Sequence, residues 1–307
     1  MEKMIKKKHL PIIGALLIML AAAMWGADGI LLRPRLYHLS VPIVVFLEHF
    51  IALIFMSPFL IYEIKSLKKI KFKDWLSFFW IALFGGAIGT MALTKALFFV
   101  NFEHLSVIII LQKLQPVFAI ILAFFLLKEK PKNEFYIWAI FAIIGSYLIT
   151  FGFHKPVITG NKLFIASMLS LLASFSWGSA TVFGKKIINI VNYSVATYIR
   201  FGLTSIIMLI IITLLRDFSN FASIGKPELL TLLIIVFTSG AVAVFIYYYG
   251  LKWIMASKAT IYELAFPVTA VALDFVIHGN IMSASQAIGA LIIIGSIIRI
   301  TSMGIKR

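Results

Sequence analysis

Long apolar runs separated by short polar segments extend through the whole chain. Ten such runs lie at about 11–32, 41–62, 75–96, 104–127, 134–153, 163–184, 194–215, 229–251, 257–278 and 283–303. Each is close to the roughly 20 residues that an α-helix needs to cross a bilayer. Because the runs at 75–96 and 104–127 are close together, nine crossings are the alternative. The pattern predicts an all-α integral membrane protein whose surroundings are the lipid bilayer.

Two of these runs carry polar residues and a proline near their middle. These residues are Gln112, Lys113, Gln115 and Pro116 in the run at 104–127, and Glu263 and Pro267 in the run at 257–278. A proline lacks a backbone donor and crowds the carbonyl four residues earlier, so the carbonyls of Gln112 and Glu263 are expected to lose their usual partners. Lipid offers no hydrogen bonds. We therefore expect both helices to line a polar cavity.

The second half of the chain repeats landmarks of the first half. The landmarks are Trp25 and Gly26 with Trp177 and Gly178, Glu48 with Arg200, Gly86 with Gly240, Pro116 with Pro267, and Gly145 and Ser146 with Gly295 and Ser296, all 150 to 154 residues apart. Their common order indicates two homologous halves, 1–153 and 154–307. Each half holds five predicted helices, an odd number, so the second half enters the membrane from the opposite side. Inverted repeats of this kind place a substrate site near the midplane, between the halves.

Composition supports a membrane protein and assigns its orientation. Of the 307 residues 62% are hydrophobic and only 13% are charged, far from the roughly 25% charged of a soluble domain. The net charge of +16 comes from lysines in short segments between apolar runs, which indicates cytoplasmic loops and not a nucleic-acid partner. Alternate segments hold 18 and 7 Lys and Arg residues. The positive-inside rule thus places both termini in the cytoplasm of a multi-pass protein of the cytoplasmic membrane.

Several features together resemble EamA-domain proteins of the drug/metabolite transporter superfamily. They are the Trp-Gly pair of the first helix, the charged residue in the second, and a fourth helix with a polar residue four before a proline and the ending Leu-Leu-Lys-Glu-Lys. The resemblance implies a ten-helix secondary transporter whose site is lined by helices one to four and six to nine, with the fifth and tenth peripheral. Glu129 matches the family's acidic residue after the fourth helix, whereas Asn280 departs from it in the second half.

Charged, amide and aromatic side chains inside the runs are candidates for transport roles, because ionisable groups are costly in a bilayer. The candidates for substrate binding are Trp25, Asp28, Glu48, Gln112, Gln115, Arg200, Tyr247 and Glu263. The candidates for gating or coupling are His49, Lys113 and Asp274, and the candidate helix breakers are Pro116 and Pro267.

The charged candidates in the first half have structural alternatives. Asp28 either contacts a proton or a substrate amine, or pairs with Arg33 or Arg35. Glu48 and Arg200 occupy equivalent positions of the two halves, so an ion pair between them either gates the site or only fixes helix packing. The forked donors of Arg200 also suit a carboxylate or phosphate.

The candidates near the two prolines also have two interpretations each. Gln112 and Gln115 share a helix face and bond either the substrate or a neighbouring helix. Lys113 faces the cavity or extends along a helix flank. Glu263 and Asp274 lie nearly on one face and suit a proton or cation path, although Asp274 is close enough to the helix end to serve as a solvated anchor.

The mixed charges of the candidates favour a zwitterion such as an amino acid, or an amphipathic metabolite, over a simple cation. Tyr247 offers either an aromatic wall for such a solute or an interface anchor. Nucleotide-binding, HExxH and GxSxG motifs are absent, and there are no cysteines, so we expect no enzyme, metal or cofactor. We predict a carrier of a small organic solute that works by alternating access, with proton coupling as an option. A channel or lipid scramblase-like pore is the alternative, and the pattern carries no signal for an oligomeric state.

Overall fold

The structure, a computed structural model, describes residues 2–99, 108, 111–155, 160–279 and 281–303. In this part of the chain, which is helical and contains no strand, nine segments are long and apolar enough to cross a membrane. Their ends agree within a few residues with nine of the ten predicted spans. The remaining span, 104–127, lies partly outside the described residues, and its described helix α6 (Gln115–Leu126) is shorter. The count of ten crossings therefore stays a prediction.

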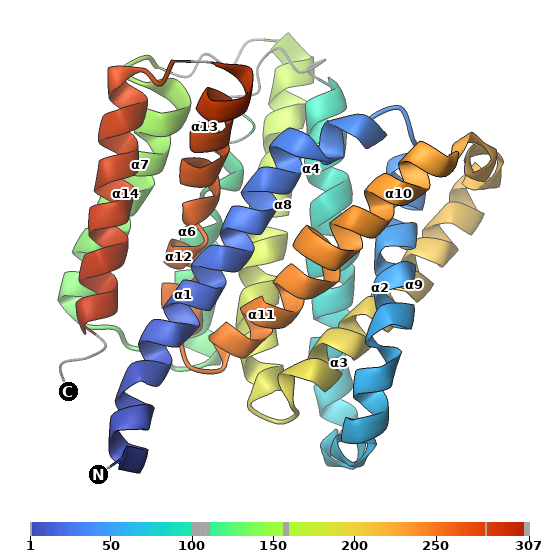
Figure 1. The fold of residues 1–307 in the computed structure, drawn as a ribbon, viewed down its shortest axis with the longest axis horizontal. Coiled ribbons are helices and arrows are strands. Elements are labelled where there is room, and N and C mark those ends of the chain that lie inside the picture. Colours follow the sequence, from blue (N-terminus) through green and yellow to red (C-terminus); the bar gives the residue numbers. More distant parts are fainter. Residues whose placement is uncertain (1, 100–107, 109–110, 156–159, 280, 304–307) are drawn as a thin grey trace.

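The helices follow the two-half organisation of the sequence (Figure 1). The first half contains α1 (Glu2–Leu31), η1 (Arg33–Leu36), α2 (Val41–Glu63), η2 (Ile64–Lys69), α3 (Phe72–Trp80), η3 (Ile81–Ile88), α4 (Gly89–Phe99), α6 and α7 (Asn133–Phe151). The second half contains α8 (Gly160–Ile188), α9 (Tyr193–Leu215), η4 (Asp217–Ser223), α10 (Lys226–Ile235), η5 (Val236–Gly240), α11 (Ala241–Leu251), α12 (Ala256–Tyr262), α13 (Ala265–His278) and α14 (Ala284–Met303). Here η3 and η5 are π-helical segments, one in the third spanning helix of each half.

The two halves pack through equivalent helices. Helix α2 lies against its equivalent α9, and α7 against its equivalent α14, while α6 lies against α12, the first part of the fourth spanning helix of the other half. The first helix of each half also packs on helices of the other half. Helix α1 contacts α11 and α13, and α8 contacts α4 and α6, which are the equivalents of α11 and α13. Helices α7 and α14 form a pair at one side of the bundle, and α1 begins at the end of the bundle where α14 finishes (Figure 1). An even number of crossings would produce that placement of the two ends.

The Trp-Gly pairs allow α1 and α8 to approach the fourth helix of the opposite half. A Cβ atom on Gly26 would lie 2.8 Å from the carbonyl oxygen of Phe266, and a Cβ atom on Gly178 would lie 2.8 Å from that of Gln115. The two contacts correspond to within one residue in the two halves. Only glycine permits so close a backbone approach, so this packing explains why both halves carry the motif.

Each fourth spanning helix is broken at one turn. Lys113 and Leu114 form the turn before α6, and Glu263 and Leu264 form the turn between α12 and α13. The two leucines share nearly the same backbone conformation, with φ of −75° and −69° and ψ of 0° and −2°. The break is thus a common feature of both halves and places polar residues at the centre of the bundle.

The structure corrects the alignment of the two breaks. Helices α6 and α13 begin 150 residues apart, at Gln115 and Ala265, so Lys113 and not Gln112 is the equivalent of Glu263. The prolines are one position out of register, because both are tolerated anywhere in the first helical turn, where no donor is lost. The Glu263 carbonyl has no bond from the residue four positions on, which is Pro267, and accepts the backbone N–H of Phe266 at 3.0 Å instead.

Candidate functional site

Four hydrogen-bonded side chains lie where the broken helices meet. Glu263 accepts one hydrogen bond from the Tyr247 hydroxyl and one from Nε2 of Gln115, each at 2.6 Å. The hydroxyls of Tyr247 and Thr181 are 2.8 Å apart. We call Gln115, Thr181, Tyr247 and Glu263 the Glu263 cluster. It joins α6 of the first half to α8, α11 and the turn before α13 of the second half.

Burial of the Glu263 cluster makes it costly to keep a charged carboxylate there unless its oxygens accept hydrogen bonds. Gln115, Thr181 and Tyr247 are buried, and Glu263 itself is half-buried. Short hydrogen bonds to an ionised acceptor are stronger than neutral ones, and each oxygen of Glu263 has such a donor. The Glu263 carboxylate can therefore accept a hydrogen bond from a ligand donor that replaces Tyr247 or Gln115.

The side chains beside Gln115 extend this polar region. Nε2 of Gln112 lies 3.5 Å from Oε1 of Gln115, at the outer limit of a hydrogen bond. Lys113 is buried, and its ammonium lies 3.6 Å from the centre of the Phe266 ring, which is a cation–π contact. The equivalent turn positions Lys113 and Glu263 therefore carry opposite charges at the junction between the halves.

Aromatic side chains form a wall next to the Glu263 cluster. The centre of the Tyr247 ring lies 5.5 Å from that of Trp25 and 5.9 Å from that of Tyr248. The indole N–H of Trp25 donates to the Ser239 carbonyl at 2.8 Å. This carbonyl belongs to the π-helical segment η5, so the irregular backbone fixes the orientation of the first aromatic ring.

Arg200 reaches the same region from α9. Its guanidinium donates to the Tyr248 hydroxyl at 3.3 Å and to the Gly85 carbonyl at 3.2 Å. Gly85 lies in η3, the π-helical segment of the first half. Within the described part of the chain, Nε of Arg200 has no hydrogen-bond acceptor. Arg200 thus connects the aromatic wall to the first half and keeps one donor unused.

A second charged group joins Asp28 of α1, Arg33 of η1 and Glu48 of α2, and we call it the Arg33 cluster. Arg33 forms ion pairs with Asp28 at 2.8 Å and with Glu48 at 3.0 Å. For Asp28 the structure therefore shows the pairing alternative. Burial on its own would lower the pKa of Arg33, but the carboxylates of Glu48 and Asp28 raise it above its ordinary value. Arg33 remains a cation between two carboxylates.

The predicted ion pair between Glu48 and Arg200 is wrong. The next residues, His49 and Phe201, meet where α2 crosses α9, with ring centres 5.5 Å apart. Side chains one position earlier point about 100° away around each helix. Glu48 therefore faces Arg33, and Arg200 faces Tyr248. Nδ1 of His49 lies 2.8 Å from the Val45 carbonyl, within its own helix.

The structure leaves Asp274 outside this region and shows a contact of Glu129 that the spacing did not indicate. Asp274 lies 11 residues beyond Glu263, roughly 16 Å along the axis of α13. Glu129 accepts hydrogen bonds from the backbone N–H of Ala256 at 2.8 Å and of Ser257 at 3.0 Å, and from the Ser257 hydroxyl at 2.7 Å. It therefore joins the segment after α6 to the start of α12. Its counterpart Asn280 lies outside the described residues.

The sequence pattern did not predict some of the residues and contacts in these groups. Thr181 is four residues after Trp177 on α8 and so nearly on one face with it, which is a weak signal. Phe266 and Ser239 contribute a ring and a carbonyl that have no polar sequence signature. The sequence suggests Arg33 only as a partner of Asp28, but in the structure it also binds Glu48.

The sequence pattern of the EamA-like transporter family matches residues 12–151 and 164–302, once in each half. The chain belongs to this family. A riboflavin transporter, ImpX, from Fusobacterium nucleatum subsp. nucleatum is 48% identical over 294 residues, which cover 94% of this chain and 98% of that protein. An uncharacterized transporter from Clostridium kluyveri is 30% identical over 268 residues, or 86% and 83% of the two chains.

A solved crystal structure shares the fold of this EamA protein at 14% sequence identity, with a TM-score of 0.73 over 95% of this chain and 97% of the other. The predicted family is therefore confirmed, and so is an all-helical fold with a duplicated unit. The family and its relatives make the protein a multi-pass membrane transporter for a small molecule, and they point away from an enzyme.

Proposed function

We propose that this EamA protein carries riboflavin across the membrane by alternating access. The support is the relative named a riboflavin transporter, which is 48% identical over nearly the full length of both chains. Riboflavin is an amphipathic metabolite, one of the two solute classes that the sequence favours. Its tricyclic ring is flat, with carbonyls and an N–H along one edge, and its ribityl chain carries hydroxyls.

The structural observation that agrees with this substrate is the pair of neutral donors on Glu263. Tyr247 and Gln115 hold the two carboxylate oxygens at 2.6 Å each. A flavin N–H can replace one of these donors, and the released Gln115 amide can then donate to the neighbouring flavin carbonyl. Trp25 and Tyr247 offer aromatic surface beside these groups for the flat ring. Few polar groups and a largely aromatic wall are typical of small-molecule sites.

Two contacts at opposite ends of the bundle suit the closures that alternating access requires. The Arg33 cluster follows the end of α1, and Glu129 binds the start of α12 at the other end (Figure 1). In the proposed cycle one contact opens while the other stays closed. The distribution of Lys and Arg assigns the Glu129 contact to the cytoplasmic side of the cytoplasmic membrane, together with both termini.

The test is counterflow of radiolabelled riboflavin in proteoliposomes that contain the purified protein. We expect saturable uptake that increases when unlabelled riboflavin is present inside, and no competition by a mixture of amino acids. Flux that rises linearly with the gradient, without this stimulation, would identify a pore. No uptake of riboflavin, together with saturable uptake of a radiolabelled amino acid, would replace the flavin by a zwitterion as the substrate. An imposed pH gradient that raises the initial rate would add proton coupling to the mechanism.

A single hydroxyl provides a sharper test of the site. Tyr247→Phe keeps the ring and removes one donor to Glu263, so we expect riboflavin transport (kcat/KM) to fall about 10- to 100-fold, the usual range for a hydrogen bond to a charged group. The matched control is Tyr147→Phe, whose hydroxyl donates to the His154 carbonyl at 2.7 Å away from the site. Equal rates for the two variants would exclude Tyr247 from substrate binding.

A further inference from the structure

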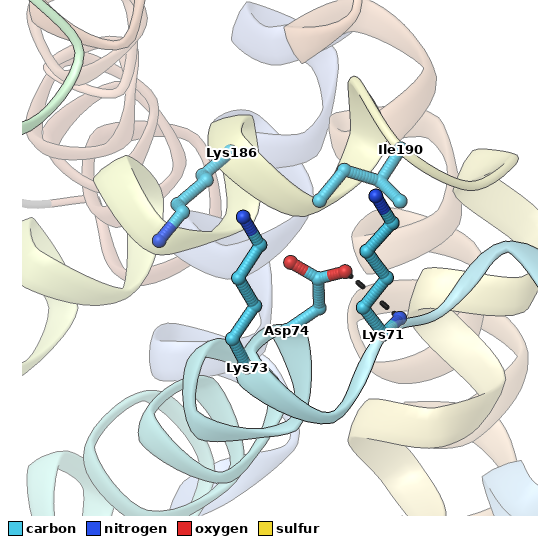
Figure 2. Close-up of a pocket in the computed structure, with 5 residues that line it drawn as sticks. All are labelled: Lys71, Lys73, Asp74, Lys186 and Ile190. Carbon is cyan, nitrogen blue, oxygen red and sulfur yellow. Dashed lines mark hydrogen bonds between the residues drawn. The ribbon is translucent and has the colours of Figure 1, made fainter.

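A basic pocket lies where α3 begins and α8 ends, apart from the transport site. It has a volume of about 420 Å³ and is lined by Lys71, Lys73, Asp74, Lys186 and Ile190 (Figure 2). We call it the lysine pocket. Two lysines come from the first half and one from the second, so the pocket crosses the boundary between the halves.

The lysine pocket carries an excess of positive charge. Asp74 is buried, and its carboxylate accepts the backbone N–H of Lys71 at 3.0 Å, which caps α3. Lys71 and Lys73 lie on either side of Asp74, and Lys186 lies beyond Lys73 (Figure 2). In the ranges that the structure describes, none of these three ammonium groups forms an ion pair with a carboxylate. Three cations around one carboxylate favour an anion with several oxygens.

An apolar helix face lies directly beside these lysines. Helix α3 exposes four large apolar side chains at helical spacing, Phe72, Trp75, Leu76 and Phe79. Phe72, between the two lysines, is 94% exposed. In a spanning helix such a face contacts lipid. A ligand that fills the pocket can therefore have an anionic head between the lysines and apolar chains along α3.

The internal repeat supplies a comparison pocket at the start of α10. This cavity of about 340 Å³ is lined by Arg35, Pro227, Glu228, Leu230, Thr231 and Ile234. Glu228 is equivalent to Asp74, and it caps its helix in the same way by accepting the Gly225 N–H at 2.9 Å. This pocket holds one arginine and no lysine, and Glu228 lies 3.4 Å from His38. The fold therefore produces the cavity but does not require its lysines.

We propose that the lysine pocket binds the phosphate-bearing headgroup of an anionic phospholipid. The distribution of Lys and Arg places this end of the bundle at the cytoplasmic leaflet, and anionic lipids bind basic pockets between spanning helices there. The lysines contact the phosphate, and the acyl chains lie along the exposed face of α3. This proposal does not depend on the transported substrate.

The experiment is native mass spectrometry of the detergent-purified protein, titrated with phosphatidylglycerol or phosphatidylcholine. We expect the wild-type protein to prefer phosphatidylglycerol and the double variant Lys73→Gln/Lys186→Gln to bind it about 30-fold more weakly. Two controls, Arg35→Gln in the comparison pocket and Lys155→Gln/Lys162→Gln at the other end, are expected to bind like the wild type.

Three results would overturn the proposal. One is equal binding of the two lipids by the wild-type protein, because the headgroup charge would then have no role. Another is an equal loss in the control variants, which would indicate a general charge effect. The third is displacement of phosphatidylglycerol by inorganic phosphate at the same concentration, which would assign the lysine pocket to free phosphate and not to a lipid.

Discussion

Polar side chains inside the bundle differ in how their charge is satisfied. Arg33, which is half-buried, lies between two buried carboxylates at 2.8 and 3.0 Å, and a network of this kind resists the loss of any member. Glu263 instead has two neutral donors, Tyr247 and Gln115. Neutral donors can be exchanged for those of a ligand without separating an ion pair. At the scale of single residues, Glu263 is therefore the group best suited to exchange with a substrate.

Glu263→Gln is expected to lower the initial rate of riboflavin transport at least about 100-fold, because two hydrogen bonds to a charged acceptor are lost. The new amide also presents a donor toward the Gln115 amide or the Tyr247 hydroxyl. The matched control is Glu134→Gln, which removes an exposed carboxylate bonded to Arg299. Both variants should elute as folded monodisperse protein in detergent. Undiminished transport by Glu263→Gln would remove Glu263 from the mechanism.

At the scale of helices, the central feature is the contact between an unbroken first helix and a broken fourth helix. Gly26 and Gly178 bring α1 and α8 within contact of the backbone at Phe266 and Gln115. These two residues follow the turns that carry Glu263 and Lys113. The glycines therefore hold the polar turns at the junction of the halves, and any shift of α1 or α8 moves the site residues as well.

Gly26→Ala is expected to destabilise the protein by about 1–3 kcal/mol, because its Cβ would lie 2.8 Å from the Phe266 carbonyl and the helices must separate. Gly178→Ala should behave alike, because its Cβ would lie 2.8 Å from the Gln115 carbonyl. The control is Gly295→Ala on α14, where no side chain and no other helix of the described part of the chain lies within 4 Å of the new Cβ. That variant should be neutral or gain up to ~1 kcal/mol from helix propensity. Unfolding in detergent measures all three, and an equal effect at Gly26 and Gly295 would contradict the packing role.

At the scale of the whole molecule, the sequence predicted the features that depend on local pattern. Apolar runs predicted the spans because lipid imposes a length on each helix, and landmark pairs at one offset predicted the duplication. The contacts of individual side chains depend on how far each helix is rotated, which no spacing determines. A rotation of one residue separates Glu48 from Arg200 and joins it to Arg33. The predicted alignment of the two breaks was wrong for a similar reason, since a first helical turn accepts proline at more than one position.

The opposed orientation of the two halves is the claim on which a shared transport site depends, and the sequence allows a direct test because it contains no cysteine. A single introduced cysteine is then the only thiol that can react. Lys73→Cys and Lys226→Cys lie in the first turns of α3 and α10, which are equivalent helices. Because the halves are inverted, we expect an impermeant maleimide to label Lys226→Cys on intact cells and Lys73→Cys only after the membrane is opened. The cysteine-free parent measures the background. Labelling of both variants from the same side would mean that the halves are parallel. Inversion could then not bring Lys113 and Glu263 together in one site at the midplane.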